Sequence, residues 1–334
     1  MTDLDPRRGL GAGLGAYVLW GLLPLYFTVL APAGPAEVVA HRALWSLVFC
    51  AAVLTVTRTW RELVVVLRSP RTLGLLALAA VLLATNWLVF VLGVQTDRVV
   101  DASLGYFVNP LVTVTLAVTV LHERLRRAQV VALSFGALAV VVLAVGYGQV
   151  PWIALVLAAS FGLYGLIKNR GVRGVAAAPG LAAETLVLAP LALAFLLVLH
   201  AQGHGTFLGH GWGHAALLAL SGVLTSVPLL LFNAAARVLP LTVVGLLQYV
   251  TPVMHFVIGV ALLGERMPPA RWAGFALVWV ALTVLTVDGL RAGRGARRVG
   301  AGAVARPGSG PGRGPGDGGE LSAPDAAGRP PRRP

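Results

Sequence analysis

Several ionisable side chains lie within long apolar stretches, where charged groups are costly and mark functional sites. His41 and Arg42 are adjacent in one stretch, and Glu184 and His255 lie in two others. Arg42 lies about one turn into its stretch. It either reaches out to water or pairs with Glu37 one turn back, or it binds a carboxylate or phosphate of a substrate. Glu184 and His255 are the candidates for proton coupling.

Amide and phenol groups share these apolar stretches. Asn86, Asn109 and Gln248 either hydrogen-bond to a neighbouring helix or contact a substrate, and the last two lie close to a proline. Tyr106 and Tyr249 each offer a flat apolar face and a hydroxyl. They form either the wall of a binding cavity or ordinary aromatic packing.

Two further aromatic residues stand in matching surroundings. Trp20 and Tyr164 are each followed by a glycine, which permits close helix approach or a bend. They are candidates for lining a cavity.

Glu123 and Glu265 each follow an apolar stretch and precede an arginine, and we interpret both as partners of the N-terminus of the helix that follows.

One segment occurs twice. Residues 104–127, LGYFVNPLVTVTLAVTVLHERLRR, match residues 246–266, LLQYVTPVMHFVIGVALLGER, after a shift of 142 positions. Pro110 then falls on Pro252, and a Glu-Arg pair follows each proline by roughly 20 Å of helix. A proline inside a helix leaves a carbonyl without its partner and kinks the helix. We expect both prolines to act as gating points in a duplicated transporter.

The composition is that of a membrane protein. The chain is 57% hydrophobic and 12% charged, and apolar runs of 18 or more residues use nearly all of residues 1–290. The sequence predicts an all-α integral membrane protein with ten spans: 9–30, 37–57, 71–94, 99–121, 127–147, 151–168, 180–200, 214–236, 241–263 and 270–290. The single cysteine, Cys50, excludes an internal disulfide.

Positive charge sets the predicted orientation. With the N-terminus in the cytoplasm, 22 of the 26 Lys and Arg residues fall on the cytoplasmic side, whereas Arg98, Arg266 and Arg271 fall outside. The net charge of +13 therefore indicates topology rather than nucleic-acid binding. Both termini are predicted to be cytoplasmic. Five spans per half place the two copies of the repeat in opposite orientations, an inverted 5+5 repeat.

The predicted organisation has four parts. Residues 1–8 are a cytoplasmic N-terminus, and residues 9–147 and 151–290 are two five-helix repeats. Residues 291–334 are rich in Gly, Pro and Arg, and we expect a disordered basic tail attracted to anionic lipids. Four histidines at 200, 204, 210 and 214 lie in a glycine-rich loop, whose spacing does not favour a metal site.

The chain resembles ten-helix members of the drug/metabolite transporter superfamily with two EamA-type repeats, and among them the RarD subfamily. The matching segments are AYVLWGLLPLYF (16–27), EVVAHRALWSL (37–47), NWLVFVLGV (86–94), ASLGYFVNPLV (102–112), ETLVLAPLA (184–192) and the later QYVTP and GER. The resemblance implies helices around a central cavity and export or exchange of small organic molecules across the inner (plasma) membrane.

The predicted function is therefore a secondary transporter of small metabolites or drugs, working by alternating access. Its partners are a small-molecule substrate and membrane lipids, without nucleic acid, cofactor or metal. The alternative is an integral membrane enzyme acting on lipid-linked substrates. That alternative expects a dense polar motif such as HExxH, and a primary pump expects GxxxxGK[ST]; the sequence contains neither motif.

Overall fold

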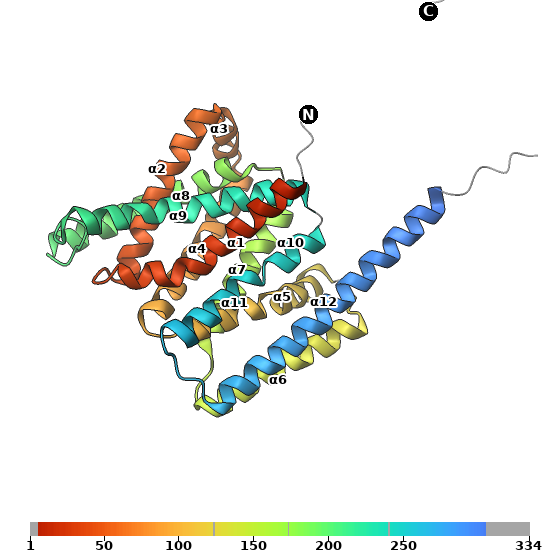
Figure 1. Ribbon diagram of the computed structural model, residues 1–334. Helices are drawn as coiled ribbons and strands as arrows, with labels where there is room; N and C mark the ends of the chain where they lie inside the picture. The colour runs from red at the N-terminus through yellow and green to blue at the C-terminus, as the bar shows by residue number, and fades with distance from the viewer. Residues whose placement is uncertain (1–5, 123, 173, 240, 305–334) are drawn as a thin grey trace, which may run out of the picture. The chain divides into compact units, whose positions relative to one another are not determined.

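The computed structural model describes residues 6–122, 124–172, 174–239 and 241–304, and all regular secondary structure in these ranges is helical. Figure 1 shows these helices. Their bounds are α1 (Pro6–Val29), α2 (Pro35–Thr57), α3 (Trp60–Arg68), α4 (Pro70–Gln95), α5 (Val99–Leu121), α6 (Arg127–Tyr147), α7 (Trp152–Leu166), α8 (Ala177–Ala201), α9 (Gly211–Val238), α10 (Leu241–Leu247), α11 (Val250–Val257) and α12 (Pro269–Val304), with π-helical turns at Ile167–Gly171 and Ile258–Leu262.

Eight of these helices are long and apolar enough to cross a membrane, and two shorter apolar helices occupy Trp152–Leu166 and Val250–Leu262. Large apolar side chains remain exposed on the helices, such as Leu191 and Leu197 of α8. Such surfaces suit contact with lipid chains. The prediction of an all-helical membrane protein is confirmed.

The ninth predicted span, 241–263, is not one kinked helix. It divides into α10 and α11, with a turn at Gln248 and Tyr249 between them. Pro252 has no N–H for the Gln248 carbonyl, and its ring would clash with that carbonyl in a continuous helix. Pro252 therefore lies in the first turn of α11, where a missing N–H costs little. Pro110, in contrast, lies inside the continuous helix α5.

The helices of the two sequence halves pack against each other rather than forming separate bundles. Helix α1 packs on α9 and α11, α2 packs on α8 and α9, and α5 packs on α7 and α11. Two glycines permit the closest approaches. A Cβ at Gly222 of α9 would lie 2.2 Å from the Trp45 carbonyl carbon of α2, and one at Gly105 of α5 would lie 2.8 Å from the Ala154 oxygen of α7.

Helices α6 and the first part of α12 run side by side at the edge of the bundle (Figure 1). Their contact is part of an apolar cluster in which Leu143 of α6 and Phe275 of α12 pack with Phe107 of α5. Most of the polar side chains singled out in the sequence lie on other helices. These helices are α1, α2, α4, α5, α7, α9 and α11, and we call them the central helices.

Two features differ from the sequence prediction. A short amphipathic helix, α3, lies between the second and third predicted spans, where the sequence analysis assigned no element. Helix α12 continues to Val304, so the segment 292–304, which was predicted to belong to the disordered tail, is helical. Ala292 onward forms a unit distinct from Met1–Arg291. The rest of the tail lies outside the described residues.

Candidate functional site

Arg42 is buried in the middle of the bundle. It is the eighth residue of α2, and only 4% of its surface is exposed. Its guanidinium lies 4.4 Å from the ring centroid of Trp87 and 5.3 Å from that of Phe27, both cation–π distances. Its Nε donates a hydrogen bond of 2.6 Å to the Thr225 hydroxyl of α9. Helices of both halves therefore hold this one charge.

Two predicted structural roles of Arg42, reaching out to water and pairing with Glu37, are wrong. The side chain does not reach water, because α2 begins at Pro35 and places Arg42 two turns inside. It does not pair with Glu37 either, since Glu37 accepts the backbone N–H of Thr206 at 2.7 Å. Among the described residues, the Nη1 atom of Arg42 is buried without a hydrogen-bond partner. A buried cation left in this state is costly unless another group completes it.

His255 of α11 lies on the same interior surface. Its ring stacks on Phe90 at 5.1 Å and meets Tyr106 at 5.7 Å. Its Nε2 lies 3.1 Å from the Trp20 carbonyl of α1. That carbonyl is available because Pro24, four residues later in α1, has no N–H to bond it. A carbonyl only accepts, so Nε2 carries the proton and the buried Nδ1 is an acceptor without a donor.

Asn86 and Tyr106 connect the helices around this surface. The Asn86 Nδ2 donates to the Leu157 carbonyl and the Ser160 hydroxyl of α7, both at 3.1 Å. Its Oδ1 accepts the Tyr106 hydroxyl of α5 at 3.1 Å. The polar groups of Asn86 thus have protein partners, which favours the helix-bonding role over substrate contact. The Tyr106 ring, in contrast, faces His255 and Phe90.

These groups form one continuous surface, which we call the central site. Phe27 beside Arg42 contacts Phe90 at 5.9 Å, and Phe90 contacts both His255 and Tyr106. The central site comprises Phe27, Arg42, Trp87, Phe90, Tyr106, Thr225 and His255, from α1, α2, α4, α5, α9 and α11.

His41 and Trp20 lie at the margins of the central site. The His41 ring stacks on Phe207 at 4.6 Å, and its Nε2 is buried without a partner among the described residues. Phe207 belongs to the loop whose Thr206 is bonded to Glu37, so this loop lies against α2. The Trp20 ring packs with Tyr17 and Phe232, and its contribution to the central site is its backbone carbonyl.

Other predicted residues lie elsewhere. Tyr249 lines a cavity of about 340 Å³ between α5, α10 and α12, together with Phe107 and Trp279. Gln248 belongs to the turn before α11. The Asn109 side chain has a buried Oδ1 without a partner among the described residues and lies next to Gly162 of α7.

Glu184 and Tyr164 belong to a separate polar cluster. Glu184 of α8 is 1% exposed, and its Oε1 lies 2.7 Å from Lys168 Nζ. The Tyr164 hydroxyl lies 3.4 Å from the other carboxylate oxygen. Of the two residues predicted for proton coupling, Glu184 is therefore held in an ion pair, and His255 lies in the central site.

Thr225 was missed by the sequence analysis, because a lone threonine in an apolar helix gives no signal. A weak pattern was present. Ser221 and Thr225 are one turn apart on α9, and both are buried. The Thr225 hydroxyl donates to the Ser221 carbonyl at 2.7 Å, which turns a lone pair towards Arg42. A polar i, i+4 pair in a mostly apolar span was the available clue.

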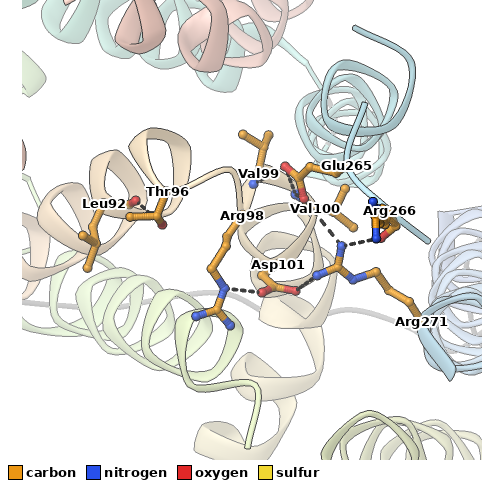
Figure 2. Close-up of polar contacts among 9 residues, drawn as sticks. All are labelled: Leu92, Thr96, Arg98, Val99, Val100, Asp101, Glu265, Arg266 and Arg271. Carbon is orange, nitrogen blue, oxygen red and sulfur yellow. Dashed lines mark hydrogen bonds and ion pairs between the residues drawn. The ribbon is translucent and has the colours of Figure 1, made fainter. Parts of the chain in front are cut away.

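A second polar cluster joins the halves at the N-terminus of α5 (Figure 2). Glu265 accepts the backbone N–H groups of Val99 and Val100, the latter at 3.1 Å. Arg271 of α12 lies 3.1 Å from Asp101 and 3.6 Å from Glu265. Arg98 also bonds Asp101, at 2.8 Å. Two carboxylates and two guanidinium groups thus hold α5 against the loop that precedes α12.

Glu265 differs from its predicted role in one respect. It partners a helix N-terminus, as expected, but the helix is α5 of the first half rather than the helix that follows it. The cause is the turn at Gly264, whose φ of +68° lets the chain fold back over α5. The matching residue of the repeat, Glu123, lies outside the described residues.

Comparison with known proteins decides the family. The sequence profile of the EamA-like transporter family matches this chain twice, over residues 7–145 and 150–287. This chain belongs to the EamA-like transporter family. EamA-type proteins are part of the drug/metabolite transporter superfamily, and the similar proteins below place this member in the RarD subfamily.

Its relatives include Protein RarD of Streptomyces exfoliatus, 51% identical over 89% of this chain and 93% of that protein. Protein RarD of Escherichia coli is 36% identical over 87% of this chain and 97% of that protein. The uncharacterized transporter YojE of Bacillus subtilis is 39% identical, over 86% and 96% respectively. A solved crystal structure shares the fold, with a TM-score of 0.56 at 18% identity over 84% of this chain and 97% of its own.

The polar cluster at the N-terminus of α5 leads to a prediction about how stability depends on pH. Burial raises the pKa of Glu265 to about 7, although the Val100 and Val99 N–H groups and Arg271 act to lower it. An unfolded glutamate titrates near pH 4.3, so the folded protein binds this proton more tightly. The stability that this proton contributes is present below about pH 4.3 and is lost as the pH rises through about 7.

We therefore expect the melting temperature of the wild type in detergent to fall, relative to that of Glu265→Gln, between about pH 5 and pH 8. Glu62→Gln, on the exposed face of α3, is the control, and its melting temperature should change with pH as that of the wild type does. A wild-type advantage that grows with pH would show instead that the N–H groups and Arg271 outweigh burial.

Proposed function

We propose that this protein is a secondary transporter that moves small organic molecules across the plasma membrane by alternating access. The observation that carries the proposal is the central site, where both halves of the chain contribute to the surroundings of one incompletely bonded charge, Arg42. A binding site at the interface of two repeats is typical of secondary transporters. The names of the relatives point to transport rather than to an enzyme acting on lipid-linked substrates.

The proposed architecture is an inverted 5+5 repeat of residues 9–147 and 151–290 around the central site. Five elements of span type occur in each half, α1, α2, α4, α5 and α6 before residue 150, and α7, α8, α9, α10–α11 and α12 after it. The double match to one family supports duplication. In this arrangement, the cluster around Glu265 and the loop around Phe207 both lie on the side proposed to face outward.

Counterflow in proteoliposomes tests transport directly. Vesicles containing the purified protein are loaded with an unlabelled solute and diluted into the same solute in labelled form, across a panel of amino acids, nucleosides, sugar phosphates and amphenicols. A carrier gives a transient overshoot of label inside, which protein-free vesicles do not. Equal uptake in both kinds of vesicle for the whole panel would contradict a transport function.

The orientation is tested by cysteine labelling, with both termini proposed to be cytoplasmic. Cys50 is buried, so background labelling is low. Arg61→Cys on α3 and Gln202→Cys after α8 occupy exposed positions on opposite predicted sides. An impermeant maleimide should label Gln202→Cys in intact cells and Arg61→Cys only in inverted vesicles. The reverse pattern would place the termini outside.

The gating proposal assigns bending to Pro110 and Pro252. Replacing each by alanine restores a backbone N–H, which favours a straighter α5 at Pro110 and a continuous α10–α11 helix at Pro252. We therefore expect counterflow to slow several-fold while the purified protein stays monodisperse. Pro190→Ala is the matched control, because Pro190 is also inside a helix but faces outward. Rates equal to those of the control in both variants would remove the prolines from the gating step.

A further inference from the structure

The side chain of Arg42 is the polar group of the central site whose bonding is least complete. Its Nε is bonded to Thr225, and its planar face is covered by Trp87 and Phe27. Nη1 is buried and has no partner in the described part of the chain. In the same ranges, no ion pair joins Arg42 to a carboxylate. A guanidinium that is desolvated in this way requires an acceptor with negative charge.

The nearby protein groups do not supply this acceptor, since Nη1 has no partner among the described residues. Tyr106 and Tyr26 carry neutral hydroxyls, which donate to Asn86 and to the Leu217 carbonyl. Glu37 is engaged with Thr206, and the two carboxylates at α5 are engaged with Arg98 and Arg271. The negative charge that completes Arg42 therefore comes from outside the described protein.

The walls around Arg42 restrict the rest of such a ligand. The rings of Phe27 and Trp87 lie beside Arg42, Phe27 contacts Phe90, and the rings of Phe90 and Tyr106 contact His255. An apolar or aromatic ligand body gains contact area with these rings, whereas a polar body would leave buried groups unsatisfied. A cationic ligand would be repelled by the uncompensated charge of Arg42.

We propose that the central site binds small carboxylates with an aromatic or apolar body, the carboxylate lying against Arg42. A carboxylate matches the planar guanidinium, and charge-assisted bonds of this kind are about twice as strong as neutral ones. This assignment rests on the proposed transport function for its biological use, but the binding site itself is defined by Arg42 and the rings beside it.

Three probes with the same ring test the assignment on the purified full-length protein: phenylacetate, phenylacetamide and phenethylamine. Phenylacetate at millimolar concentration is expected to raise the melting temperature, since a ligand that binds the folded state stabilises it. The amide and the amine, which lack the anionic group, are expected to have no effect. Absence of a shift with phenylacetate, or an equal shift with the amide or amine, would overturn the assignment.

Variants locate the site. Arg42→Gln should weaken phenylacetate binding by at least about tenfold, in line with the loss of a charged hydrogen bond. Arg42→Lys keeps the charge but not the planar guanidinium, so its affinity for phenylacetate should lie between those of the wild type and Arg42→Gln. Arg61→Gln, at an exposed position of α3, is the control and should bind like the wild type. Unchanged affinity in Arg42→Gln would contradict the proposal.

A measurement on the wild type avoids dependence on folding of the variants. Counterflow of the three probes by the wild-type protein in proteoliposomes, set up as described above, is such a measurement. Counterflow of phenethylamine but not phenylacetate would leave transport standing and remove the carboxylate assignment. Binding of phenylacetate without counterflow of any probe would keep the site and remove the transport function.

Discussion

The structure depends on the requirement that backbone polar groups within a membrane find partners inside the protein. A proline in a central helix creates an exception, and one such exception is resolved between the halves. Pro24 frees the Trp20 carbonyl, and His255 of α11 lies against it at 3.1 Å. The Ser103 hydroxyl of α5 adds another bond between the halves, which the Pro252 carbonyl accepts at 2.8 Å. Backbone carbonyls thus help to specify which helices of the two halves lie together.

The same interface carries the one buried charge of the central site. Thr225 brings α9 to Arg42, and the rings of α1 and α4 cover the guanidinium. Neither half alone provides this environment. The interface that satisfies the backbone therefore also forms the proposed binding site, and a movement of the halves would change both together. This coupling is what alternating access requires of a repeat interface.

The helical membrane architecture could be predicted from sequence because long apolar runs leave few other structures available. Several details could not. Whether Pro252 kinks or ends a helix depends on its neighbours, and here the chain divides at Gln248 and Tyr249. The partner of Arg42, Thr225, is 183 positions away. A repeat identifies equivalent positions, but it does not say which side chains meet across the interface. For that reason, Glu265 was assigned to the wrong helix.

The Glu265 contacts have a consequence for the order in which the protein matures. The carboxylate that caps α5 lies 166 positions beyond Val99 in the chain. When the first half leaves the ribosome, the N–H groups of Val99 and Val100 lack that carboxylate, and Arg42 lacks Thr225. The first deficit to end is that of Arg42, when α9 has entered the membrane, and that of Val99 and Val100 ends only when the segment around Glu265 has followed. Insertion of the first-half helices and completion of their native contacts are consequently separate events, and the second waits for synthesis of the second half.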